Sequence, residues 1–211
     1  EIDSHLPSNG LPLGVLHQFL ITHNNTATLG FLVALLSKLA KQAPGFIFWF
    51  MPFKKNYSIY GPGLKMLGLN PSRIIFIENR KSQNLLWGIH ESLSCSCLLA
   101  VVAEVNESEI TWLISRKLQL ASEKSGVSCF LLSTKQHTLL KPSAAFSRWW
   151  INSLSSNFFD NLEPTSKSLS PNNKSYWILK LERCRGTSSS EWKIEWHYET
   201  HNFNMVPVSS N

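Results

Sequence analysis

The chain has 211 residues, of which 43% are hydrophobic and 16% charged, and its formal net charge is +6. This length and composition suffice for one domain with a sizeable buried core. The positive charge favours an acidic partner such as nucleic acid, but Lys and Arg form no dense run, which excludes a basic arm.

Neither a membrane segment nor a metal site is expected. The apolar run from Leu29 to Leu36 is far too short to cross a bilayer. The four cysteines lack the spacing of a zinc finger or of a disulfide framework, so buried free thiols are expected at Cys95, Cys97, Cys129 and Cys184. Since the chain shows no apolar signal at its beginning, we expect a cytoplasmic protein.

From residue 13 on, segments of strand and helix character alternate along the chain. Residues 1–12 contain Pro7, Gly10 and Pro12 and are expected to form a lead-in without regular structure. Apolar residues then recur first at strand spacing and next at helix spacing. The pattern predicts strands at 13–21, 46–51, 73–77, 97–104 and 127–132, and helices at 26–41, 62–67, 82–94 and 108–125.

After Ser133 the pattern changes to short strands of antiparallel type, predicted at 146–151, 177–181 and 192–196. Residues 152–175 are rich in Ser, Asn and Pro and are expected to form a mobile loop, and residues 200–211 a flexible tail. The predicted fold is therefore α/β. It is one domain from 13 to 199 with a doubly wound, mostly parallel sheet, helices on both faces and antiparallel C-terminal strands.

The turn between the first strand and the first long helix is where a nucleotide-hydrolysing α/β domain holds phosphate. Such a loop needs glycines, whose backbone N–H groups surround the phosphate oxygens, together with a lysine and a Ser or Thr hydroxyl. Because glycine and lysine are both missing, we expect no tight ATP binding, no cofactor and no ATPase activity. The residues at this degenerate position are Thr22, His23, Asn24, Asn25, Thr26, Ala27 and Thr28.

Acidic residues suited to catalysis are equally scarce. The apolar strand at 46–51 carries no carboxylate. Glu104 ends the strand at 97–104 and is either a residual ligand contact, or a helix cap or surface group. His90 and Glu91 are adjacent in a helix and point in different directions, so they are expected to form a polar helix face. No catalytic residue is predicted.

The positive indications concern binding. Basic side chains lie near the ends of predicted strands, and Arg beside Trp suits base stacking or phosphate contact. The alternative is that these clusters are solvated strand edges and buried indoles. The candidate DNA-binding residues are Arg116, Lys117, Lys135, Lys141 and Arg148.

Several short motifs in a fixed order carry a family resemblance. They are Tyr-Gly-Pro-Gly-Leu at 60–64, Leu-Gly-Leu-Asn-Pro at 67–71, the segment Leu-Trp to Glu-Ser-Leu at 86–93, Ser-Arg-Lys-Leu-Gln-Leu-Ala at 115–121 and Trp-Ile-Leu-Lys-Leu-Glu-Arg-Cys-Arg-Gly at 177–186. Together they resemble the ImuA family, RecA-like proteins of the bacterial damage-inducible mutagenesis cassette. The resemblance extends roughly from Leu13 to Trp196, and a degraded phosphate loop is common in that family.

The resemblance implies a RecA-like, cytosolic, non-catalytic protein that acts in translesion synthesis after DNA damage. Its implied partners are ImuB, an inactive polymerase-like protein, and an error-prone polymerase, with RecA and weakly bound single-stranded DNA as further candidates. The family's C-terminal part is implicated in ImuB contact, and Trp and Arg are frequent interface anchors. The candidate partner-binding residues are therefore Trp177, Arg183, Arg185, Trp192 and Trp196.

Two other protein classes resemble the same core. A SulA-like cell-division inhibitor, which binds the tubulin-like protein FtsZ, also lacks the phosphate loop, but such chains typically stop near the segment after Leu132. An active RecA-type recombinase requires the very loop that this chain lacks. The ImuA-like adaptor is therefore the leading hypothesis and the SulA-like inhibitor is the alternative.

Overall fold

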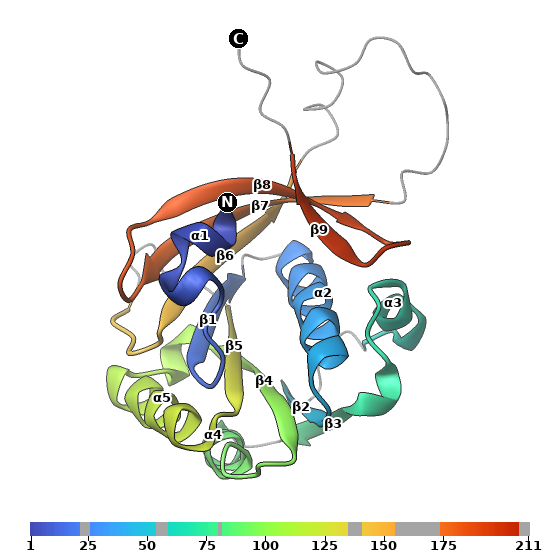
Figure 1. The fold of residues 1–211 in the computed structure, drawn as a ribbon. Helices are drawn as coiled ribbons and strands as arrows, with labels where there is room; N and C mark the ends of the chain where they lie inside the picture. Colours follow the sequence, from blue (N-terminus) through green and yellow to red (C-terminus); the bar gives the residue numbers. More distant parts are fainter. Residues whose placement is uncertain (22–25, 54–58, 80–81, 135–140, 155–173, 207–211) are drawn as a thin grey trace, which may run out of the picture.

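The computed structural model describes residues 1–21, 26–53, 59–79, 82–134, 141–154 and 174–206. Within them, a mixed sheet of nine strands has the order β3-β2-β4-β5-β1-β6-β7-β8-β9 (Figure 1). The strands are β1 (Leu16–Ile21), β2 (Phe46–Pro52), β3 (Ile74–Asn79), β4 (Leu98–Asn106), β5 (Ser128–Thr134), β6 (Ser147–Ser153), β7 (Lys174–Cys184), β8 (Ser190–His197) and β9 (Asn202–Met205).

The α-helices are α1 (Ile2–His5), α2 (Ala27–Gln42), α3 (Gly61–Met66), α4 (Ser82–Ser92) and α5 (Trp112–Ser125), and short 3-10 helices are η1 (Pro7–Asn9), η2 (Pro71–Arg73) and η3 (Glu107–Glu109). The helix α5 begins and ends at recognisable signals. The Thr111 hydroxyl accepts a hydrogen bond from the Ile114 backbone N–H, and Gly126 follows with a positive φ of 77°. These caps explain why α5 begins later than the predicted residue 108.

Six strands, from β3 to β6 in the sheet order, run parallel, and β7, β8 and β9 are antiparallel. Helices α4 and α5 pack on one face, where Ile89 and Leu118 lie in the core, and α2 packs on the other through Leu32 and Leu36. The predicted α/β class, mostly parallel with antiparallel C-terminal strands, is thereby confirmed.

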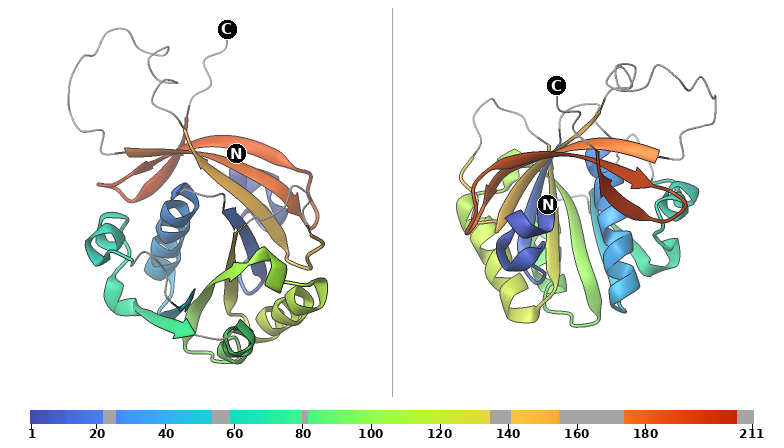
Figure 2. Two further views of the ribbon diagram at one scale, coloured as in Figure 1. Left: turned by 180° about the vertical axis from the view of Figure 1, so that it is seen from behind. Right: turned by 45° about the horizontal axis from the view of Figure 1, so that its top comes forward.

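The C-terminal strands bend over α2 and form a lid-like layer above the end of the parallel strands (Figures 1 and 2). Their inward side chains share one core with α2, as Trp177 packs edge-on against Phe31 with 5.9 Å between ring centroids. The strand predicted at 146–151 was expected to be antiparallel. This is confirmed for its pairing with β7 but is wrong for its pairing with β1, to which β6 runs parallel. Short-range alternation cannot distinguish these two neighbours.

Both chain ends hold more structure than predicted. Residues 1–12 include α1 and η1, and Leu6 between them is buried. Residues 202–205 form β9 rather than a flexible tail, because Phe203 packs against Trp196 with 4.6 Å between centroids. Of the predicted loop at 152–175, the first two residues belong to β6 and the last two to β7, while residues 155–173 and 207–211 lie outside the described residues.

A single arginine closes the turn from α2 to β2. Arg73 donates hydrogen bonds to the carbonyl oxygens of Ala40 at 2.6 Å, Ala43 at 3.0 Å and Gly45 at 2.8 Å. A planar guanidinium group can donate to several carbonyl oxygens at once because its N–H groups point in fixed directions. The turn between α2 and β2 is thus held by the last residue of η2, directly before β3.

Candidate partner-binding surface

The first turn of α2 stands where a phosphate loop would present its lysine and hydroxyl. Of the degenerate loop, residues 22–25 lie outside the described residues, and Thr26, Ala27 and Thr28 begin the helix. Thr28 is fully buried, and its hydroxyl donates a hydrogen bond to the Ile151 carbonyl of β6 at 3.1 Å. This hydroxyl therefore serves the packing of α2 on β6.

A cavity of about 380 Å³ opens beside this turn. Leu29 and Val33 of α2, Tyr60 before α3 and Trp177 of β7 contribute to its walls. None of the described residues that line it carries a formal charge. A magnesium triphosphate needs cationic and hydrogen-bonding groups around its phosphates. Among the described residues, the lining of this cavity beside the start of α2 is therefore uncharged and largely apolar.

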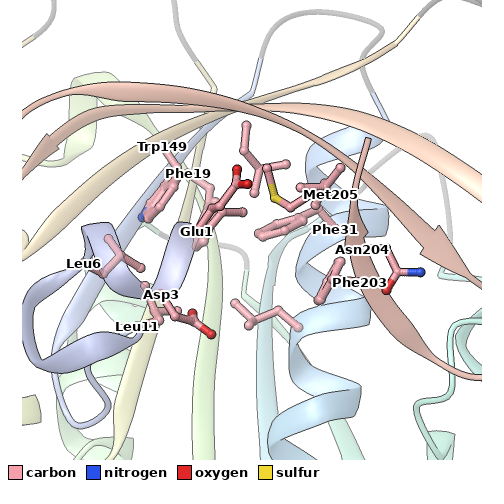
Figure 3. A pocket seen from close by; sticks show the side chains of 14 residues that line it. Glu1, Asp3, Leu6, Leu11, Phe19, Phe31, Trp149, Phe203, Asn204 and Met205 are labelled. Atoms are coloured by element: carbon pink, nitrogen blue, oxygen red, sulfur yellow. The ribbon is translucent and has the colours of Figure 1, made fainter. Parts of the chain in front are cut away.

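A second cavity, of about 260 Å³, lies beneath the bent C-terminal strands (Figure 3). Phe19, Phe31 and Trp149 form its aromatic walls, and Glu1 and Asp3 lie at its edge. Its inner surface has the character of the surrounding core. Aromatic walls of this kind accept an apolar group and provide no phosphate contact.

Glu104 is buried within β4 and is 3% exposed. Its Oε1 accepts a hydrogen bond from the Trp49 indole Nε1 at 2.9 Å, and β4 continues for two residues beyond it. A buried indole N–H needs such a partner. The carboxylate that the sequence offered as a ligand contact, cap or surface group is instead placed in the core, where it orients Trp49.

The candidate DNA-binding residues are distributed over different parts of the fold. Lys117 is exposed on α5 and Arg116 is half-buried beside it, whereas Lys135 lies outside the described residues. Arg148 is only 6% exposed and donates hydrogen bonds to the Gln18 side chain at 3.1 Å and to the Lys141 carbonyl at 2.8 Å. Burial, together with the nearby charge of Arg183, lowers the pKa of Arg148.

The three candidate tryptophans belong to the inner face of the C-terminal strands. Trp196 is fully buried, Trp177 is 4% exposed and Trp192 is half-buried. Trp192 packs near Trp149, with 6.2 Å between centroids, and edge-on to His5 at 5.2 Å. These rings fill the core around α1 and α2 and present little surface to a partner.

The two candidate arginines hold an extended segment, residues 141–146, which we call the strap and which leads into β6. Arg183 donates hydrogen bonds to the carbonyl oxygens of Ser143 at 2.7 Å and Ala145 at 2.8 Å. Arg185 donates to the carbonyl between them at 2.8 Å. Both side chains thus satisfy main-chain acceptors in a segment that has no helical hydrogen bonds.

The side chains on the other face of the C-terminal strands point away from the core. On β7, Tyr176, Ile178 and Lys180 alternate with the buried Trp177 and Leu179 and point away from α2. We call these three side chains, with Lys193 and Glu195 of β8, the outer face. Sequence reasoning missed them because it selected the tryptophans, although a period of two through Trp177 already assigns its neighbours to the opposite side.

The charges of the outer face are arranged around its apolar members. Ile178 stands opposite Lys193, and Tyr176 stands opposite Glu195. Glu195 lies 3.1 Å from the Lys174 ammonium. Burial raises the pKa of Glu195, but hydrogen bonds from His197, Lys174 and Asn204 outweigh burial and leave it below its ordinary value. The outer face therefore combines an apolar centre with a charged rim.

Comparison with known proteins decides the family. No family model matches the chain. Protein ImuA of Caulobacter vibrioides, from strain NA1000 / CB15N and from strain ATCC 19089 / CIP 103742 / CB 15, is in each case 30% identical over 207 residues, which covers 92% of this chain and 80% of the relative. The chain belongs to the ImuA family. The resemblance predicted from the motifs is thereby confirmed, and membership indicates an ImuA-like role.

No helix in the described ranges is long and apolar enough to span a membrane. Within the same ranges, no group of three or more His, Cys, Asp or Glu side chains is placed to hold a metal ion.

Proposed function

We propose that this protein is a non-catalytic, RecA-like accessory protein of SOS-induced, error-prone translesion DNA synthesis. It acts in the cytoplasm as an adaptor that holds an ImuB-like protein and an error-prone polymerase, with RecA and weakly held single-stranded DNA as further candidate partners. Membership of the ImuA family supports the pathway. The uncharged cavity beside α2 supports the non-catalytic role.

The cavity is the observation on which the non-catalytic role depends. Phosphoryl transfer is accelerated almost entirely by positioning and by charge, through a lysine, a magnesium ion and its carboxylate ligand. Here the first turn of α2 has no basic residue, the Thr28 hydroxyl is bound to Ile151, and Glu104 is bound to Trp49. A scaffold of this class without those groups is suited to binding another protein.

The outer face is the surface we assign to the ImuB-like partner. Interfaces depend on a few well-packed apolar or aromatic anchors surrounded by a polar rim. Ile178 and Tyr176 supply such anchors, and Lys180 and Lys193 supply basic rim groups. This assignment keeps the C-terminal location implied by the family and replaces the inward-facing tryptophans with outward-facing neighbours, which are half-buried except for the exposed Lys180.

The substitution Ile178→Glu tests this assignment. A carboxylate at the centre of an apolar contact would be desolvated without a partner, so capture of a purified ImuB-like protein should weaken by about tenfold or more. The measurement is a pull-down titration with the tagged full chain, with thermal unfolding as the check that the variant still folds.

The matched control is Ile75→Glu, the same substitution on β3 at the far edge of the sheet, where Ile75 is 43% exposed. It should leave capture unchanged. Equal losses in both variants would refute the outer face as the interface. Recovery of FtsZ in place of the ImuB-like protein from a damage-induced lysate would favour the SulA-like alternative.

A further inference from the structure

Two of the four cysteines lie together in the turn between α4 and β4. Cys95 is half-buried and Cys97 is exposed, and their Sγ atoms are 2.9 Å apart. The expectation of buried thiols holds for Cys129 and Cys184 but is wrong for this pair. The reason is that the pair follows the last turn of α4 and precedes the buried part of β4, so Cys95 packs only at the edge of the core and Cys97 lies outside it.

The backbone around the pair is fixed by hydrogen bonds. The Cys95 N–H donates to the Ser92 carbonyl at 3.0 Å, and the Cys95 carbonyl accepts from the Leu98 N–H at 3.1 Å. The Cys97 carbonyl accepts from the Phe46 N–H at 3.3 Å. Two consecutive turns and one contact to β2 therefore hold both Cα atoms, so the thiols meet without any large movement of the chain.

Gly45 makes this close approach of β2 sterically feasible. A Cβ atom at Gly45 would lie 2.9 Å from the Cys97 carbonyl oxygen, closer than such atoms normally approach, and the residue has a positive φ of 122°. Glycine is the residue type that tolerates both constraints. The position of Cys97 is thus built into the junction of two strands.

The two thiols differ in acidity because of their mutual contact. The hydrogen bond between the two thiols lowers the pKa of Cys95. The same hydrogen bond raises the pKa of Cys97. Burial alone raises the pKa of Cys129 far above its ordinary value. Because the thiolate is the reactive form, Cys95 is placed to react first and Cys97 to respond.

We propose that Cys95 and Cys97 form a reversible dithiol–disulfide site that reacts with low-molecular-weight disulfides. The Cys95 thiolate attacks one sulfur of the small disulfide, forms a mixed disulfide and releases one small thiolate. That thiolate accepts the Cys97 proton, and the Cys97 thiolate then attacks Cys95 Sγ and expels the second small thiolate. The second small thiolate takes up from solvent the proton that Cys95 released when it ionised, so two protein thiols are oxidised to one disulfide while one small disulfide is reduced to two thiols.

The surroundings favour an anionic reagent such as oxidised glutathione. Ser94, the residue before the pair, lines a cavity of about 600 Å³ together with His90, Lys117 and Lys124. Cationic side chains at that place attract the carboxylates of a glutathione adduct. This turn is at the opposite end of the parallel strands from the outer face, so its chemistry is independent of the proposed partner contact (Figure 1).

The test exposes the folded full chain to a glutathione redox buffer and follows intact mass and cysteine-containing peptides. The wild type should lose two hydrogens in mass through a Cys95–Cys97 linkage, while Cys129 and Cys184 should be alkylated only after unfolding. Cys97→Ser should accumulate a glutathione adduct on Cys95. Cys95→Ser, which lacks the partner thiol, should carry the glutathione adduct on Cys97 and form no internal disulfide.

A wild-type chain that stays fully reduced in an oxidising buffer would overturn the proposal, as would one that carries glutathione without closing the linkage. In the wild type, a brief exposure followed by acid quenching should place the transient glutathione adduct on Cys95, and an adduct found first on Cys97 would overturn the assignment of Cys95 as the attacking thiol. Near-ultraviolet circular dichroism reports whether the serine variants fold. If they do not fold, peptide mapping of the wild type still tests whether the Cys95–Cys97 disulfide forms. Cys184→Ser is the matched control and should not alter the mass change.

Discussion

At the scale of single residues, a buried histidine joins the neighbouring parallel strands β1 and β6. His17 of β1 is fully buried, its Nδ1 lies 2.6 Å from the Ser147 hydroxyl and its Nε2 lies 2.8 Å from the Pro12 carbonyl. The Trp149 indole donates to the same hydroxyl at 2.7 Å. This chain of donors assigns the proton of a neutral imidazole to Nε2 and directs the hydroxyl proton to Nδ1.

His17 predicts a specific loss of stability in acid. Burial lowers its pKa from 6.5 to about 4, opposed in part by the hydrogen bond to Pro12. Above pH 6.5 the imidazole is neutral in the folded and the unfolded chain. As the pH falls towards 4, the unfolded chain takes up a proton that the folded chain excludes, so the free energy of unfolding should fall by about 3 kcal/mol.

Urea unfolding at pH values of about 7 and about 4.5 measures this loss. His17→Gln removes the titrating group and should flatten the pH dependence over this interval, although it also lowers stability at neutral pH. The control is His90→Gln, which alters a histidine whose side chain is 44% exposed and should retain the wild-type dependence. An unchanged acid loss in the His17 variant would contradict the assignment.

At the scale of elements, the start of α2 predicts the absence of ATP turnover. Its first turn carries no basic residue, and the cavity beside it is uncharged among the described lining residues. We expect that a fluorescent ATP analogue does not bind at micromolar levels. Hydrolysis should also be absent with or without single-stranded DNA, with an active RecA-type ATPase as the positive control. Turnover of even about 1 s⁻¹ would contradict the prediction.

The elements that the sequence predicted well are those that local pattern decides. The helix at 26–41 is observed as α2, and the apolar run at 46–51 is observed as β2, since each has a long periodic or continuous apolar pattern. β9 was missed because four residues give too short a pattern, and its pairing with β8 depends on Phe203 meeting Trp196. The parallel side of β6 depends on β1, more than a hundred residues away in sequence.

The candidate partner-binding residues show the same division. Their general location on β7 and β8 follows from the sequence, but the choice between Trp177 and its neighbours requires knowing which side of the strand faces α2. Arg183 and Arg185 were selected for their charge, and the structure shows that they bind the strap. The sequence shows which Trp and Arg side chains are present, but the packing of the strands on α2 determines which side chains are accessible to a partner.

At the scale of the whole molecule, the C-terminal strands are part of the core and not an appendage. Trp177, Leu179 and Trp196 lie in the same apolar cluster as the residues of α2. A chain that ends at residue 154 lacks β7, β8 and β9 and leaves the inner side of α2 open to water. We therefore expect such a chain to lose its cooperative thermal transition and its near-ultraviolet dichroism.

The control is a chain that ends at Val206, which keeps all nine described strands and should unfold cooperatively. A chain ending at residue 154 that folds with a sharp transition would contradict the account of a shared core. For the same reason, a truncation cannot be used to locate the partner, and point substitutions on the outer face are the appropriate test.

The arginines that hold the strap and the α2–β2 turn change how the positive charge of the molecule is understood. Four of the six arginines, Arg73, Arg148, Arg183 and Arg185, donate hydrogen bonds to main-chain carbonyl oxygens. The positive charge of such a guanidinium group raises the isoelectric point, while its hydrogen bonds hold it against main-chain carbonyl oxygens. These four groups keep their charge, but the main chain fixes their positions, so their presence does not by itself indicate an acidic partner. Relatives whose isoelectric points differ widely are expected to keep this architecture as long as guanidinium groups stand at these four places.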